Sequence, residues 1–520
     1  MAQLDRRGFL AAGVACVGAA LAGPAAGRLH AALAGERMVS LRDLRFLGAE
    51  RADPVSGRCH YVAQTPGRRV VQPVLVARTG DEVDLIVENA LPQPTTVHFH
   101  GLTLPEAADG AGFEPILPGG RRRVRFEVRN RAGLYWVHPH PHGFTAEQVY
   151  SGLVAPLVVA DAEEDALDAA LALAPSNRLA LAIADARVAG DLWRPYAPTM
   201  HDCLHGWLGN RALANGAADA RYAVRPGWVR LQLLNACNAR GLLLAFRYGE
   251  TPVPFQLLGT DGGLLTAPRE VESVFLYGAE RVDVALDISA RNAVSAVSLQ
   301  FDPRHHAHGK HIHHHPQRGS YPPLAGDGVC SASAPSGDSI PDGAALPLFQ
   351  LQVTQGRGAA APRMPERLSS LAEPFDPAGV PVRRIRLDFD ERGFLIDESP
   401  YRLEEGGYEV KRGSREVWEV RNSPISMPHA MHLHGFGFRV LRRQGTFGPA
   451  RRLATLPGGR LPTDLGLKDT VTVWPNETVL LAVDFSLPAA AAFGGRQRYM
   501  FHCHNLEHED GMMMRNLTVL

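Results

Sequence analysis

The sequence predicts an all-β protein made of three similar sandwich or barrel domains. Apolar residues alternate with polar ones in segments such as 83–87, 229–233 and 479–485, which is the pattern of half-buried strands. Three similar segments, EVDLIVENA, WVRLQLLNA and REVWEVRNS, end at Asn89, near Asn235 and at Asn422, which suggests a repeat of about 150 residues. Glycine, proline and asparagine separate the alternating runs, which favours antiparallel sheets over an α/β arrangement.

The composition sets broad limits on the class of protein. The chain has 520 residues, of which 45% are hydrophobic, and its 54 basic side chains balance 54 acidic ones. A chain of this length can form two to four ordinary domains. Zero net charge argues against nucleic acid or an anionic membrane as the main partner. The hydrophobic content excludes a wholly disordered or collagen-like chain.

The first residues resemble a twin-arginine export signal. Arg6 and Arg7 precede Phe9, Leu10 and a short apolar run that is too short to span a bilayer comfortably. We therefore expect a signal peptide in residues 1–34, cleaved somewhere between 22 and 34, and a periplasmic or secreted protein without membrane insertion. A chance arginine pair before an apolar stretch is the alternative.

Composition also suggests where the domains meet. An acidic, alanine-rich stretch covers residues 161–174, and a stretch rich in glycine, proline and alanine covers about 319–380. The predicted division is domain 1 at 38–165, domain 2 at 175–318 ending in a histidine-rich segment, a linker at 319–380 and domain 3 at 381–520.

Histidine is the most informative residue type. The chain has 22 histidines, and chance predicts roughly one HxH pair where eight occur. Outside the histidine-rich segment, these pairs lie in domains 1 and 3, in the sequences HFHG, HPHPHG, HAMHLHG and HCHNLEH. Metal chemistry is therefore expected between domains 1 and 3.

Strand geometry predicts that one segment serves two metal sites. Successive side chains of a strand point to opposite faces, so His502 and His504 share one face and Cys503 points to the other.

The same alternation applies to HAMHLH. His432 and His434 share a face, and His429 falls on the other. Grouping by face places His429 and His508 with Cys503 and a methionine, which is the ligand set of a blue-copper centre. The remaining eight histidines are too many for one ion and suit a cluster.

In order and spacing, these segments resemble those of the multicopper oxidases, whose fold is three consecutive cupredoxin-like Greek-key domains. The resemblance implies four copper ions. It assigns the type 2 ion to His98 and His432, and the type 3 pair to His100, His138, His140, His434, His502 and His504. It assigns type 1 copper to His429, Cys503, His508 and Met513, with Met512 and Met514 as one-residue alternatives.

Further segments, including LLNACNAR, LGLKDT and HEDGMMM, resemble bacterial laccases and periplasmic cuprous oxidases. The family pattern implies that Asp109 and Glu509 are the catalytic carboxylates that deliver protons to oxygen. A turn aspartate and a surface glutamate are the alternatives. Asp469 is either a partner that orients an imidazole or part of a solvated turn.

The expected activity is that of a laccase-like, copper-dependent oxidoreductase with O2 as electron acceptor. Its substrate would be a phenol, an aromatic amine or Cu(I), oxidised near an exposed edge of His429 or His508. The alternatives are a cuprous oxidase in copper tolerance and a non-enzymatic periplasmic copper-binding protein. We expect a monomer with no nucleic-acid partner.

The remaining histidines and cysteines carry less specific signals. Residues 305–315 contain seven histidines and form either a copper-gathering segment or an inert insertion. Surface or core positions are expected for His30, His60, His201 and His205, and a position outside the ligand set for His142. Up to two disulfides can form among Cys59, Cys203, Cys237 and Cys330.

Overall fold

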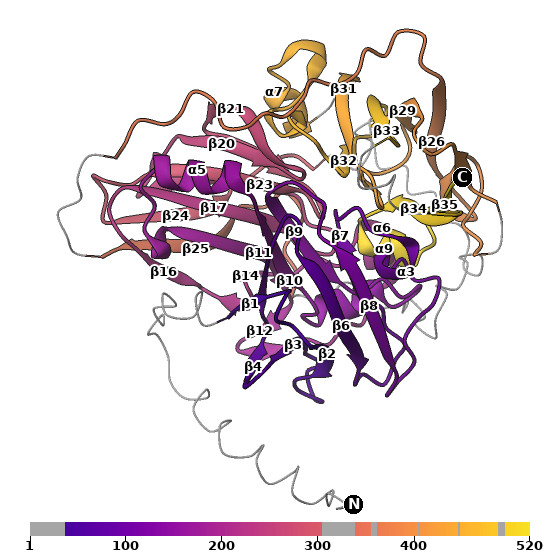
Figure 1. Cartoon of the computed structure of the whole chain (residues 1–520), viewed down its shortest axis with the longest axis horizontal. Coiled ribbons are helices and arrows are strands. Elements are labelled where there is room, and N and C mark those ends of the chain that lie inside the picture. Colours follow the sequence, from indigo (N-terminus) through magenta and orange to yellow (C-terminus); the bar gives the residue numbers. More distant parts are fainter. Residues whose placement is uncertain (1–36, 304–337, 355–360, 404–405, 446–447, 487–493) are drawn as a thin grey trace, which may run out of the picture.

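A computed structural model describes residues 37–303, 338–354, 361–403, 406–445, 448–486 and 494–520. The chain forms three units, each of two main sheets packed around its own core (Figure 1). The all-β prediction is confirmed. The predicted signal peptide and the histidine-rich segment 305–315 lie outside the described residues.

The first unit contains two five-stranded sheets. Its strands are β1 (Met38–Ser40), β2 (Phe46–Arg51), β3 (Cys59–Thr65), β4 (Arg68–Val71), β5 (Val74–Arg78), β6 (Glu82–Asn89), β7 (His98–His100), β8 (Arg121–Glu127), β9 (Gly133–His138) and β10 (Ala155–Ala160). The strand orders are β1-β5-β10-β9-β7 and β4-β3-β2-β6-β8.

The second unit has larger sheets. Its strands are β11 (Arg178–Ala186), β12 (Val188–Ala189), β13 (Leu192–Trp193), β14 (Arg211–Ala214), β15 (Ala217–Ala218), β16 (Arg221–Val224), β17 (Trp228–Asn235), β18 (Leu242–Tyr248), β19 (Thr251–Pro252), β20 (Phe255–Thr260), β21 (Gly263–Val271), β22 (Ser273–Leu276), β23 (Arg281–Asp287), β24 (Ala293–Ser298) and β25 (Leu346–Val353). The main orders are β15-β14-β11-β17-β23-β20-β21 and β16-β25-β24-β18-β19.

The third unit again has two five-stranded sheets. Its strands are β26 (Val382–Asp390), β27 (Gly393–Ile396), β28 (Tyr408–Val410), β29 (Arg415–Asn422), β30 (His429–Leu433), β31 (Phe438–Gln444), β32 (Thr470–Val473), β33 (Thr478–Asp484), β34 (Gln497–Cys503) and β35 (Met514–Val519). The orders are β27-β26-β29-β33-β31 and β28-β35-β34-β30-β32.

Short helices connect and cover the sheets. They are α3 (Glu106–Asp109), α4 (Thr145–Tyr150), α5 (Ala162–Ala170), α6 (Met200–His205), α7 (Gly448–Leu453), α9 (Leu506–Asp510) and the 3-10 turns η1 (Pro175–Asn177), η2 (Pro457–Gly459) and η3 (Pro462–Asp464). Within the described ranges, no helix combines the length and apolarity needed to cross a bilayer.

The three repeated sequence segments occupy equivalent strands. β6, β17 and β29 each pair in parallel with a preceding strand (β2, β11 and β26) and antiparallel with a following one (β8, β23 and β33). The sheets are therefore mixed rather than purely antiparallel, because a Greek-key chain returns to strands that it has already passed.

Each repeated strand ends in the same buried turn. Asn89, Asn235 and Asn422 have no solvent exposure. In each, the side-chain amide donates to two backbone carbonyls, such as those of Arg240 and Leu276 for Asn235. A shared polar anchor at the same strand end confirms that the three segments are copies of one unit.

The predicted linker needs a correction. Within residues 319–380, β25 pairs with β24 and with β16, so this strand belongs to the second unit. Leu348 and Leu351 of this strand are buried. The glycine, proline and alanine content of the surrounding stretch obscured this short alternating run.

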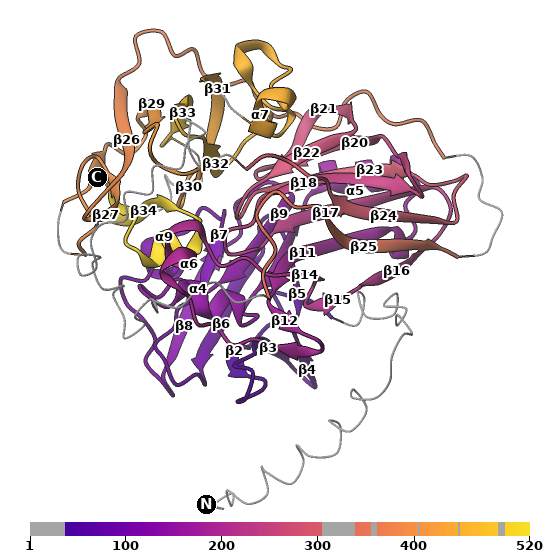
Figure 2. The same cartoon turned by 180° about the vertical axis from the view of Figure 1, so that it is seen from behind.

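The third unit closes over the first and the second. Its helix α9 contacts α4 of the first unit and α6 of the second, and α3 contacts β34. Figures 1 and 2 show α9 beside α6 in both views. The ends of β7, β9, β30 and β34 therefore meet where all three units come together.

A substitution in β17 tests whether the second unit has a tightly packed core. Leu231 on β17 is fully buried, so Leu231→Ala should lower the free energy of unfolding by about 3 kcal/mol through lost burial and a residual cavity. Leu192 is 71% exposed, and Leu192→Ala should change stability by less than about 0.5 kcal/mol. Chemical denaturation measures the free energy of unfolding of both variants. Equal losses would show that Leu231 does not lie in a packed core.

Candidate metal centre

Two strand pairs bring the predicted ligands together. In the first unit, β7 pairs with β9 so that His98 lies opposite His138. In the third unit, β30 pairs with β34 so that His432 lies opposite His502. All ten predicted histidine ligands and Cys503 are at most 1% exposed.

Burial keeps these imidazoles neutral. It lowers the pKa of His98 and of His434 to about 3, because a charged ring loses its hydration in the interior. It lowers the pKa of His502 as well, and raises that of the Cys503 thiol. A neutral imidazole keeps one nitrogen lone pair, which is the form that binds a metal.

The strand β34 separates its side chains as the alternation predicts. Cys503 Sγ lies 3.4 Å from His429 Nδ1 and 3.7 Å from His508 Nδ1. On the other face, His502 Nε2 lies 3.0 Å from His434 Nε2 and 3.4 Å from His140 Nε2. One strand therefore contributes to two separate clusters.

The thiol cluster is held in place from outside. His508 Nε2 donates to the Leu204 carbonyl at 3.0 Å, and His429 Nε2 contacts Ser426 Oγ at 2.8 Å. The outer nitrogens are thus occupied, and both Nδ1 atoms, 3.3 Å apart, face the thiol. Phe394 stacks on the His508 ring at 3.8 Å.

Core packing distinguishes the three neighbouring methionines. Met513 is fully buried in the same apolar cluster as Cys503. Met512 and Met514 pack instead with Ala111 and Tyr401, in a separate cluster. This favours Met513 as the fourth group of the thiol site.

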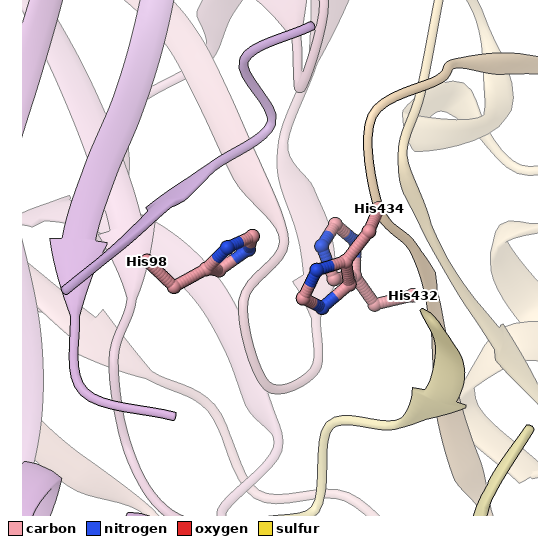
Figure 3. Close-up of side chains that lie close together, drawn as sticks. All are labelled: His98, His432 and His434. Carbon is pink, nitrogen blue, oxygen red and sulfur yellow. The ribbon is translucent and has the colours of Figure 1, made fainter. Parts of the chain in front are cut away.

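A second cluster has nitrogen lone pairs without partners. His98 Nδ1 donates to the Asp109 carbonyl at 2.7 Å and His432 Nδ1 to the Asp469 carbonyl at 2.9 Å. Their Nε2 atoms are buried without a hydrogen-bond partner among the described residues. Figure 3 shows His98 facing His432 and His434 across the boundary between units. Facing lone pairs in a dry interior repel unless a cation lies between them, so this donor set fits a metal ion.

Two further groups of histidines share His98 and His434 with this cluster. Ligand atoms of His140, His434 and His502 lie within 4.8 Å of one another, as do those of His98, His100 and His138. The His504 ring centroid lies 5.0 Å from that of His100 and 5.1 Å from that of His138. The structure therefore gathers all eight predicted cluster histidines at one place.

The two predicted catalytic carboxylates lie inside the protein, beside the cluster. Asp109 Oδ2 accepts from His434 Nδ1 at 2.8 Å. Gly110 adopts φ 78°, and a Cβ there would lie 2.1 Å from the Val97 carbonyl oxygen, so only glycine permits this turn. The Glu509 oxygens lie 3.5 Å from His140 Nε2 and 3.4 Å from His502 Nδ1. Asp109 does precede a turn, but both carboxyl groups are buried, so neither lies at the surface.

The second unit reaches the cluster through an ion pair that the sequence did not reveal. Asp469 is buried and accepts from His100 Nε2 at 3.1 Å. Arg281 at the start of β23 donates to both oxygens of Asp469, the Nη1 bond being 2.6 Å, and to the Asp261 carbonyl. Asp469 thus orients an imidazole and does not form a solvated turn. A lone arginine in a strand gave no signal of this role.

The expectation of an exposed edge on His429 or His508 is wrong. Both His429 and His508 are fully buried, so neither presents an exposed edge to a substrate, because α6 and Ser426 cover them. His142 lies outside the ligand groups, as the sequence predicts. Its ring packs edge-on to Tyr401, and its centroid lies 6.1 Å from that of His140.

Sequence comparison agrees with this geometry. Two family models described as multicopper oxidase match residues 55–164 and 375–520, the two segments that carry the ten predicted histidine ligands. The chain belongs to the multicopper oxidase family. Copper is therefore the metal that the buried clusters of this multicopper oxidase fit.

Known relatives cover most of the chain. It is 26% identical over 451 residues to the multicopper oxidase mco of Staphylococcus haemolyticus, covering 86% of this chain and 81% of that protein. It is 28% identical over 460 residues to the laccase of Bacillus subtilis, covering 82% and 79%. The cell division protein FtsP of Yersinia pestis is 28% identical over 444 residues, covering 84% and 81%.

A solved structure shows the same three-part fold. McoA multicopper oxidase from the hyperthermophile Aquifex aeolicus superposes with a TM-score of 0.75 at 28% identity, covering 93% of this chain and 97% of that one.

The cysteines outside the metal centre differ in whether they form a disulfide. Cys59 and Cys237 are free thiols, whereas Cys203 is disulfide-bonded. Cys330 lies outside the described residues. The sequence allowed two disulfides among these four, and two free thiols exclude a second one.

Removing Arg281 tests the contribution of the second unit. Arg281→Met leaves the Asp469 carboxylate buried without its cation, so we expect a loss of about 3–5 kcal/mol in unfolding free energy, together with weaker copper retention. Arg123 pairs with Asp84 at the surface, where water screens the two charges, so Arg123→Met should leave the free energy of unfolding almost unchanged. Denaturation and copper analysis measure these effects. Equal small losses would show that the ion pair does not support the cluster.

Proposed function

We propose that this multicopper oxidase is laccase-like and couples one-electron oxidation of a reducing substrate to four-electron reduction of O2 to water. The observation that carries the proposal is the position of Cys503 between His502 and His504. The thiol belongs to one cluster, and its covalent neighbours belong to the other. A few backbone bonds therefore link the mononuclear site to the multinuclear one.

The donor atoms support four ions of three types. His429, Cys503, His508 and Met513 would hold the type 1 ion, and His98 with His432 the type 2 ion. The type 3 pair would take His100, His138, His140, His434, His502 and His504. When bound, four copper ions can store the four electrons that O2 reduction needs.

The protein's own groups prepare the site. Burial excludes water, and the carbonyls of Asp109 and Asp469 fix which nitrogen of His98 and of His432 carries the proton. The Asp109 and Glu509 carboxyl groups lie on the domain 1 and domain 3 sides of the cluster. We assign them the transfer of protons to oxygen.

A non-enzymatic copper-binding protein is the second candidate. The similarity to FtsP supports it, because that relative is named for cell division and not for an oxidase activity. The complete set of ten histidines and one cysteine supports the enzyme, because a carrier does not need a cluster. Copper stoichiometry separates the two: about four ions per chain with O2 consumption indicates an oxidase, and one or two without turnover a carrier.

For the setting of the reaction we propose the periplasm or the exterior, reached by twin-arginine export, and a monomeric enzyme. Arg6 and Arg7 before the apolar run support this location. Phenols, aromatic amines and Cu(I) are the substrate classes that this centre can oxidise.

Replacing the bridging thiol tests the proposed function. Cys503→Ser should abolish the visible thiolate-to-copper absorption, leave about three of the four copper ions in place and lower O2 consumption more than about 100-fold. Cys59→Ser removes a free thiol on β3 of the first unit and should change neither the absorption, the copper content nor the O2 consumption. Full turnover in Cys503→Ser would refute the electron route.

Copper removal should weaken the association of the first and third units. The ligands come from the first and third units, so bound copper links them and stabilises the folded state by mass action. We expect the thermal transition to fall by more than about 4 °C in the apoprotein and to recover on reloading. Calorimetry measures this shift, and an unchanged transition would mean that copper does not bridge the units.

A further inference from the structure

Helix α6 stands between the thiol site and solvent. The Leu204 carbonyl accepts the hydrogen bond from His508 Nε2 at 3.0 Å, and α6 packs against α9, which carries His508. A substrate therefore does not reach the His508 ring directly in this conformation. It meets the outer side of α6 instead.

The helix is fixed firmly in this position. Thr199 and Asp202 form a reciprocal capping box at its first turn. The Asp202 carboxylate also pairs with the buried Arg187 guanidinium. A short helix anchored in this way holds its side chains in constant positions.

Two histidines lie on α6, one turn apart. The rings of His201 and His205 are 4.5 Å apart between centroids. His201 is exposed and His205 is partly exposed. Histidines at positions i and i+4 of a helix share a face and can bind one transition-metal ion through both imidazoles. The sequence alone indicated only unremarkable surface or core positions for them.

We propose that His201 and His205 form a docking site for an oxidisable first-row transition-metal ion, with Cu(I) as the substrate that fits best. This inference rests on the proposed oxidase function. Imidazole suits copper in both of its oxidation states, so the pair can bind the ion before and after it loses an electron.

The route from this pair to the thiol site is short. From the His205 ring it passes through Cβ, Cα and the amide nitrogen to the Leu204 carbonyl, and then through one hydrogen bond to His508. Each Cu(I) becomes Cu(II) and gives up one electron. Four such ions supply the four electrons that, with four protons, convert one O2 into two waters.

Metal binding is tested first, with Ni(II) as a redox-inert probe. The histidines of residues 305–315 would also bind Ni(II), so both proteins compared carry serine at those seven positions and are fully loaded with copper. We expect His201→Asn/His205→Asn to weaken binding of one Ni(II) at least about tenfold in calorimetric titration. His60→Asn, on β3, is the matched control and should bind as the parent does. Equal Ni(II) binding in the double variant would overturn the docking site.

Kinetics then tests the role of the pair as an electron entry point. In the double variant, the ratio of kcat/KM for Cu(I) to that for a phenol should fall at least about tenfold, with the visible thiolate-to-copper absorption retained. An unchanged ratio would refute the entry route even if Ni(II) binds. If the parent lacks that absorption or consumes no O2 with either substrate, the proposed function itself fails, which is a different outcome.

Discussion

Opposite orientation of neighbouring side chains along β34 is the constraint on which the metal centre depends. The thiol of Cys503 points into the core of the third unit, toward His429 and His508, while His502 points toward histidines of both outer units. An extended strand is the simplest backbone that connects two clusters while keeping them apart. Helical backbone here would place these groups on overlapping faces.

The rest of the fold holds this strand against the first unit. β7 and β9 present their histidines from one side, and β30 and β34 from the other, so the cluster forms only when the first and third units meet. Asp109 illustrates the coupling: its backbone fixes His98 of its own unit, and its carboxylate fixes His434 of the third. Facing lone pairs make the empty arrangement unfavourable, and a cation relieves that repulsion.

The second unit contributes no histidine of the predicted ligand set, yet it contacts both clusters. Arg281 holds Asp469, which orients His100, and Leu204 on α6 accepts the hydrogen bond of His508. Its part is therefore to orient ligands and to control which surface a substrate meets.

The sequence by itself indicated the strand class, the threefold repeat, the candidate ligand residues and their separation by face. These are local properties. Alternation follows from the backbone geometry of a few consecutive residues, and the spacing of the histidines and the cysteine can be read directly from the sequence. Only the tertiary structure decided that Arg281 meets Asp469, that α6 covers His508, and that β25 joins the second unit. Such contacts join residues distant along the chain, and no periodic pattern records them.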